Sequence, residues 1–143
     1  QVLRSLLALD RDKGKLADSV ARIAKAVEAN PKDSALAEIQ GEAALLSGDA
    51  YFALANYAKA ESMYRTALAK GIIANREGKD QLARAQLHLG MALAHKGDYS
   101  AAKSEFAKVP AGNRQKIAEY WSIFMDQKLA PPKPAVATAT PKT

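Results

Sequence analysis

Apolar side chains recur at helical spacing along most of this chain. They return every three or four residues, which is the period of an amphipathic helix and not the alternation of a strand. The breaks between these periodic segments predict helices at about 2–13, 16–29, 34–47, 50–70, 82–96, 99–108 and 114–129. The predicted fold class is therefore all-α.

Helix-breaking residues separate the periodic segments. Asn30-Pro31 should end a helix, because proline cannot continue one and disfavours the helical conformation of the residue before it. Asp33 or Ser34 can then cap the following helix. Gly48-Asp49 and Gly97-Asp98 have the composition of turns, and these two pairs predict where hairpins reverse.

Two further segments lack the helical pattern. Residues 75–80 are polar and predict a connector. Residues 130–143 are rich in proline, alanine and threonine, so they offer too little apolar surface to offset the entropy of ordering. We expect this tail to be disordered.

Composition and charge narrow the function classes. The net charge is +6 with a pI near 9.6, but the basic residues are scattered, which indicates a solvated surface and argues against nucleic acid as the partner. The absence of cysteine excludes disulfides and thiolate chemistry. No apolar run approaches the roughly 20 residues of a membrane span. Because the chain begins with Gln1, we interpret it as processed or cut, with any signal peptide already removed.

Candidate chemical groups are few. His88 and His95 are the two histidines, and seven residues of helix place them roughly 10 Å apart, too far to share one zinc ion. Neither has a nucleophile or an orienting acid beside it. Glu38 and Glu42 lie one turn apart, and such a pair is more often a solvated helix face than an acid–base site. We expect no enzyme activity, no metal, no cofactor and no small-molecule substrate.

The helices recur as pairs with a period of about 34 residues. The anchor positions of the third pair are Gln86, Leu89, Gly90, Leu93, Ala102 and Phe106. Those of the second pair are Ala37, Gln40, Gly41, Ala44, Ala60, Tyr64 and Ala67. Those of the first pair are Leu3, Leu6, Leu7, Asp10, Ser19, Ile23, Ala26 and Pro31. The pattern resembles the tetratricopeptide repeat family, in which Leu-Gly and an aromatic residue are followed by Ala, Phe and Pro.

The resemblance implies a right-handed α-solenoid built from three tetratricopeptide-like helix-turn-helix pairs and a C-terminal capping helix. The pairs are expected at about 1–33, 34–74 and 83–116, with the cap at about 114–129 and the tail at 130–143.

Packing accounts for the recurring side-chain sizes in this pattern. Small residues such as Gly90 and Ala102 let paired helices approach closely, and a large residue such as Phe106 fills the gap to the next pair. The second pair carries about seven extra residues near 50–56, and the sequence leaves open which of its helices is longer.

The resemblance also implies a non-enzymatic protein–protein interaction module or scaffold. In this family the ligand, a peptide or a partner helix, lies on the concave face along the first helices of the pairs. The residues that map to this groove are Arg4, Arg11, Glu38, Ile39, Glu42, Leu45, Arg84, Leu87, His88, Met91 and His95. Tyr51 and Phe52 either pack on a neighbouring pair or offer an aromatic contact to a partner.

The stretch ALAKGIIANREGKDQLARAQLHLGMALAHKGDY resembles bacterial envelope-associated members of the family. That resemblance implies a periplasmic or envelope-linked assembly, with a cytoplasmic location as the alternative. Two other functions stay open: an accessory domain of a larger protein or enzyme, and a basic helical repeat that binds nucleic acid. The sequence does not identify the partner or the oligomeric state.

Overall fold

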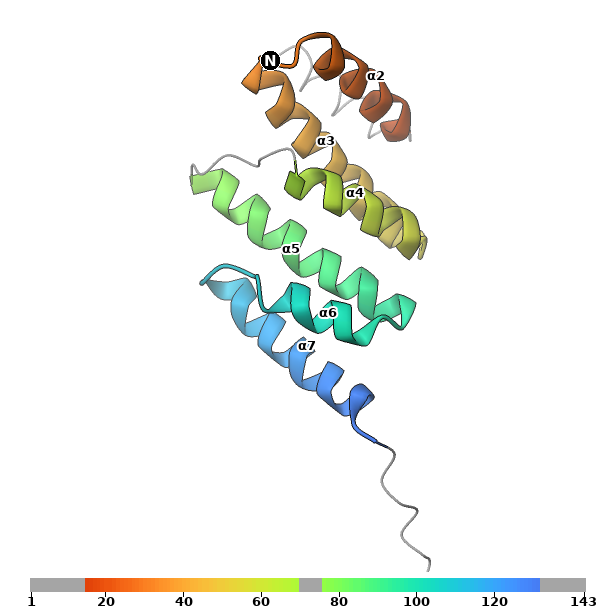
Figure 1. Ribbon diagram of the computed structural model, residues 1–143, viewed down its shortest axis with the longest axis vertical. Coiled ribbons are helices and arrows are strands. Elements are labelled where there is room, and N and C mark those ends of the chain that lie inside the picture. Colours follow the sequence, from red (N-terminus) through yellow and green to blue (C-terminus); the bar gives the residue numbers. More distant parts are fainter. Residues whose placement is uncertain (1–14, 70–75, 132–143) are drawn as a thin grey trace, which may run out of the picture.

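The computed structural model describes residues 15–69 and 76–131, and over these ranges the chain forms α-helices and no strand. The helices are α2 (Leu16–Ala29), α3 (Ser34–Ala53), α4 (Tyr57–Ala69), α5 (Arg76–Lys96), α6 (Tyr99–Phe106) and α7 (Asn113–Leu129). Each packs against the next, so that α2 and α7 lie at opposite ends of an elongated stack (Figure 1). The predicted helix at 2–13 and the tail from 132 onward lie outside the described residues.

The predicted break between α2 and α3 is confirmed. α2 ends at Ala29, and the Asn30 side chain donates a hydrogen bond to the Ala26 carbonyl at 3.1 Å. The Asp33 carboxylate accepts from the backbone N–H groups of Ala35 and Leu36, at 3.0 and 3.3 Å. Asp33 therefore satisfies two of the amide groups that a helix N-terminus leaves without partners.

Gly48 lies inside α3, and the turn predicted at Gly48-Asp49 was wrong. α3 continues to Ala53, so the predicted helix at 50–70 is divided between the end of α3 and all of α4. A Cβ atom at Gly48 would lie 2.6 Å from the ring of Tyr64, which belongs to α4. Glycine is needed here for the close approach of two helices and not for a positive φ.

The α5–α6 hairpin repeats the α3–α4 hairpin with an offset of 42 residues. Gly90 meets the ring of Phe106 in the way that Gly48 meets the ring of Tyr64, and a Cβ atom at Gly90 would lie 2.5 Å from that ring. Both rings are buried. Each ring therefore fills the space that a glycine leaves within its own hairpin. The sequence analysis had instead predicted that these rings fill the gap to the next pair.

The two turns repeat with the same offset. Ala55 follows α3 with φ +58°, and Gly97 follows α5 with φ +87°. The Ala55 N–H donates to the Phe52 carbonyl at 2.9 Å, and the Gly97 N–H donates to the Ala94 carbonyl at 3.0 Å. The turn predicted at Gly97 is confirmed, whereas the equivalent turn at Ala55 uses a residue for which the left-handed conformation costs about 1–2 kcal/mol.

This register corrects the predicted alignment of the second pair. Gly48, and not Gly41, occupies the place that Gly90 has in the third pair. The extra residues of the second pair therefore lie before Gly48, and they belong to its first helix, α3. The first helix of the third pair, α5, has almost the same length, at 21 residues against 20 for α3. Because α5 begins at Arg76, the polar connector predicted at 75–80 was wrong from that residue on.

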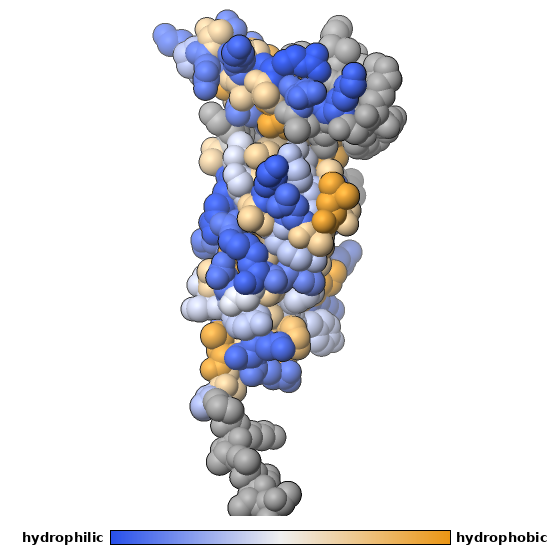
Figure 2. All heavy atoms as spheres, turned by 90° about the vertical axis from the view of Figure 1, so that its right-hand side faces the viewer, coloured by the Kyte–Doolittle hydropathy of each residue, from blue (hydrophilic) through white to orange (hydrophobic). Residues whose placement is uncertain are grey.

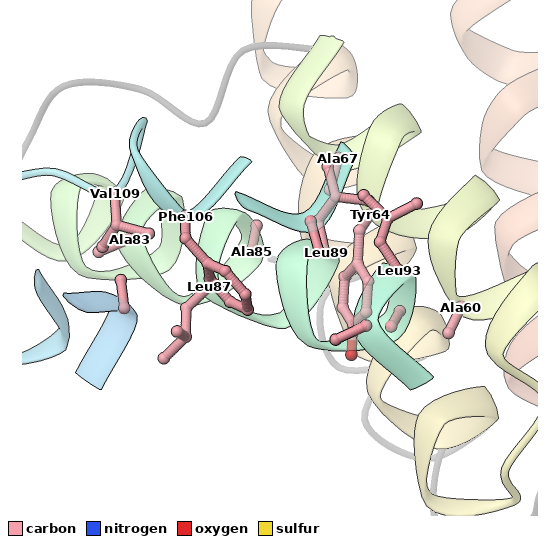
Figure 3. Packing of buried hydrophobic residues seen from close by; sticks show 14 of the residues in the cluster. Ala60, Tyr64, Ala67, Ala83, Ala85, Leu87, Leu89, Leu93, Phe106 and Val109 are labelled. Carbon is pink, nitrogen blue, oxygen red and sulfur yellow. The ribbon is translucent and has the colours of Figure 1, made fainter. Parts of the chain in front are cut away.

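One apolar core runs through α3, α4, α5, α6 and α7, and a smaller cluster joins α2 to the N-terminal half of α3. In the main core Tyr64 lies against Leu89 and Leu93 of α5, while Phe106 lies beside Leu87 (Figure 3). Trp121 of α7 packs against the same core. Among the described helices none is long and apolar enough to cross a membrane.

The variant Gly90→Ala is expected to destabilise the protein by about 1–3 kcal/mol, because its methyl group would collide with the Phe106 ring in a packed interior. Helix propensity favours alanine by only about 1 kcal/mol, so overpacking should prevail. Phe106→Leu removes the colliding ring, and in that background Gly90→Ala should cost little. Urea unfolding of the wild type, both single variants and the double variant measures this coupling. Strictly additive effects would contradict the contact.

Candidate functional site

The candidate site contains ionisable and aromatic side chains from α3 and α5, the first helices of the two hairpins, and from α7. On α5, Arg84 and His88 are one turn apart, and His95 follows two turns later, so all three lie on one side of the helix. The side chains of Arg84 and His88 are 36% and 30% exposed. They are therefore reachable from solvent while packed against a neighbouring helix.

Asp49 of α3 joins three helices through its carboxylate. The Tyr64 hydroxyl of α4 donates to it at 2.7 Å, and Nδ1 of His88 on α5 lies 2.8 Å from the same oxygen. The Arg84 guanidinium donates to the other carboxylate oxygen. An ionised carboxylate only accepts hydrogen bonds, so the contact places a proton on Nδ1 of His88. We call Asp49, Tyr64, Arg84 and His88 the Asp49 cluster.

Within the Asp49 cluster, the pKa of Asp49 is lowered and the pKa of Tyr64 is raised. Burial alone would raise the pKa of Asp49, but the hydrogen bonds from His88 and Tyr64 and the charges of His88 and Arg84 hold that pKa below its ordinary value of 3.8. Burial, together with the hydrogen bond to Asp49, raises the pKa of Tyr64 above its ordinary value of 10.0. At neutral pH the carboxylate is ionised and the phenol is protonated. This arrangement favours positioning of the imidazole over proton transfer.

Aromatic rings continue the surface from the Asp49 cluster toward α7. Phe52 of α3 lies parallel to the His88 ring at a centroid distance of 6.2 Å, and it meets the His95 ring edge-on at 5.5 Å. Tyr57 of α4 stacks on His95 at 4.5 Å with an interplanar angle of 6°. His95 in turn lies 6.1 Å from Trp121 of α7. We call Phe52, Tyr57, His88, His95 and Trp121 the aromatic row.

The α7 end of the row opens onto an apolar hollow. Trp121 stacks on Phe106 at 5.8 Å and meets Phe124 edge-on at 6.1 Å. Tyr120, Trp121 and Phe124 line a hollow of about 250 Å³. The row thus runs from a charged cluster at one end to an apolar hollow at the other.

The predicted groove residues are divided between this face, the core and the undescribed segments. Arg84 and His88 both contact Asp49, and His95 lies beside Phe52, whose ring also borders His88. Ile39, Leu45 and Leu87 are 7%, 2% and 4% exposed, and their assignment to a partner-binding surface is corrected because they form the core. Met91 is half-buried against that core. Arg4 and Arg11 lie outside the described residues, and Glu38 and Glu42 are half-buried in the N-terminal half of α3.

Several residues of the site were not predicted. Asp49 was assigned to a turn, so its reach toward α5 was not foreseen, and Tyr57 and Trp121 were not among the predicted site residues. Phe52 follows the first alternative stated for it, because it is half-buried against the core and borders His88 and His95 of the neighbouring hairpin, whereas its contact to a partner stays a prediction. The 42-residue offset is the signal that would have placed Asp49 within a helix.

Elsewhere several charged residues form ion pairs between helices. Lys96 of α5 donates to Glu61 of α4 at 2.8 Å, and Arg65 of α4 lies 3.8 Å from Glu105 of α6.

The described ranges hold no group of three or more His, Cys, Asp or Glu residues that could bind a metal ion. No family model matches this sequence, and no curated protein matches it.

The variant Asp49→Asn is expected to lower the free energy of unfolding at pH 7 by about 1–3 kcal/mol, since the amide leaves a half-buried guanidinium without its counter-charge. Because the pKa of Asp49 is lowered on folding, its contribution is complete above the ordinary value of 3.8 and is lost as the pH falls below it. The stability difference between wild type and variant should therefore shrink in acid.

Urea unfolding at a series of pH values measures this difference. Asp98→Asn is the control, because it makes the same chemical change at an exposed position. A stability difference for Asp49→Asn that stays constant down to about pH 2 would contradict the ionised cluster.

Proposed function

We propose that this chain is a tetratricopeptide-like module, a right-handed α-solenoid, that binds a segment of another protein along the aromatic row. The observation that carries the proposal is the row itself, in which rings from α3, α4, α5 and α7 lie in sequence across the hairpins. Rings and imidazoles supply large contact area with few rotatable bonds, which is why aromatic residues dominate the energetic centres of protein interfaces.

The repeat of the hairpins supports the family part of the proposal. Glycine in the first helix, a buried alanine and an aromatic ring in the second helix recur in both complete hairpins. These are the residue types that the tetratricopeptide pattern requires at the contact of paired helices. A bacterial envelope location, which the sequence resemblance implies, belongs to the same proposal.

The electrostatics of the row favour a protein segment over nucleic acid. Nucleic-acid binding depends on cations that are free to neutralise phosphates, whereas the charge of Arg84 is already matched by Asp49. A matched and fixed guanidinium instead offers its remaining N–H groups as oriented donors to a backbone carbonyl or a polar side chain. The lowered pKa of Asp49 and the raised pKa of Tyr64 likewise favour binding over acid–base catalysis.

The variant His95→Glu tests the row directly. His95 is exposed and stands at the centre of the row, so a carboxylate there should disrupt ring contacts with a ligand while the core is kept. Peptides are first selected from a phage-displayed library against the wild-type protein. Their dissociation constants, measured by biolayer interferometry, should rise by about tenfold or more with His95→Glu.

The control variant is Ser104→Glu, which introduces the same side chain at an exposed position of α6. It should bind the selected peptides as the wild type does. If the peptides bind the wild type and both variants with equal affinity, the row is not their binding site and the proposal fails.

A further inference from the structure

α7 carries apolar side chains around a wide arc of its circumference, part of it buried and part exposed. One part is buried in the stack, with Ala118 2% and Met125 0% exposed. The other part bears four large apolar residues that are exposed, which we call the outer face of α7: Ile117 (45%), Tyr120 (75%), Ile123 (56%) and Phe124 (44%). Figure 2 shows hydrophobic side chains at the lower end of the stack, interleaved with hydrophilic ones.

The outer face does not have the shape that receives another helix of the stack. α3 and α5 present a glycine to the helix that follows, and the ring of that helix rests on it. α7 contains no glycine that could receive such a ring, and the Phe124 side chain is itself 44% exposed. A further hairpin helix could not approach α7 as α6 approaches α5.

The C-terminal segment that follows α7 carries few large apolar side chains. Residues 130–143 contain four prolines, and their only large apolar side chain is Val136. α2, the first described helix, lies at the opposite end of the stack (Figure 1).

The charges around the outer face are predominantly basic. Lys116 and Lys128 are exposed on α7, and the Lys128 ammonium lies 5.3 Å from the centroid of the Phe124 ring. α7 carries three basic and two acidic residues, and one of the three basic residues, Arg114, is paired with Asp80 of α5. One of the two acids, Asp126, is already paired with Lys103 of α6.

We propose that the outer face of α7 docks on an anionic lipid surface. Protruding tyrosine, phenylalanine and isoleucine side chains flanked by lysines are the combination that inserts at the headgroup–acyl boundary of a bilayer. Tyr120, Ile123 and Phe124 enter that boundary, and Lys116 and Lys128 contact the lipid phosphates. Neither Arg84 nor His95 takes part.

Vesicle sedimentation tests this proposal with the full chain. The protein should sediment with vesicles of phosphatidylcholine mixed with an equal part of phosphatidylglycerol, and much less with vesicles of phosphatidylcholine alone. The double variant Tyr120→Glu/Ile123→Glu should lower partitioning onto the anionic vesicles by about tenfold or more. Lys116→Gln/Lys128→Gln should weaken binding and reduce its dependence on salt.

The control variant is Ala58→Glu/Ser62→Glu, which adds the same charge at exposed positions of α4, a helix that does not contact α7. It should sediment with the anionic vesicles far more than the outer-face variant does. Circular dichroism and thermal unfolding establish that all variants are folded. Trp121 is the only tryptophan, so its fluorescence should shift to the blue when the wild type binds vesicles.

Three results would overturn the proposal. The wild type could fail to sediment with anionic vesicles, or the outer-face variant could sediment as well as the wild type. The outer-face variant could also change only the oligomeric state in sedimentation velocity, which would make the face a contact between protein chains. His95→Glu, which tests the aromatic row, should leave vesicle binding unchanged, so the two proposals stand or fall separately.

Discussion

The contact between a glycine on one helix and an aromatic ring on the next sets the spacing of both complete hairpins. With no side chain at Gly48 or Gly90, the rings of Tyr64 and Phe106 lie directly on the helix backbone. This fixes the ring of Tyr64 so that its hydroxyl reaches the carboxylate of Asp49, the neighbour of Gly48 in sequence. The Tyr64 side chain thus makes both contacts, because its ring packs on Gly48 and its hydroxyl donates to Asp49.

From that hydrogen bond the structure of the site follows by charge balance. A half-buried carboxylate needs several donors to offset its desolvation, and Tyr64 supplies only one of them. Arg84 and His88 of the next hairpin supply the others, so the same carboxylate that completes one hairpin fixes the register of the following one. The imidazole of His88 is held by its Nδ1 atom, and its ring is thereby presented to Phe52. In the Asp49 cluster, the burial of the Asp49 carboxylate, its ionised state and the orientation of the His88 ring therefore depend on the same hydrogen bonds.

The sequence predicts local signals well and long-range register poorly. The break at Asn30-Pro31 and the turn at Gly97 follow from backbone chemistry that acts within a few residues, and both were predicted. Gly48 was not, because glycine serves equally for a positive φ and for close helix approach, and the local pattern does not distinguish the two uses. The grouping of Arg84 and His88 was predictable from their spacing on one helix. Their partner Asp49 was not, since its place depends on how two hairpins stack.

The same reasoning explains why α7 was identified as a cap but its second surface was missed. An amphipathic helix is recognised in a sequence by an apolar stripe about 100° wide with polar residues opposite. The apolar residues of α7 cover a wider arc, so the sequence alone does not distinguish those that enter the core from those that stay exposed. The structure divides them: Met125 is fully buried, Tyr120 projects into solvent, and Trp121 lies between, in contact with Phe106 on one side and Phe124 on the other. Because the apolar residues of α7 are divided between buried and exposed positions, only the packing of the helix shows which of them belong to the core.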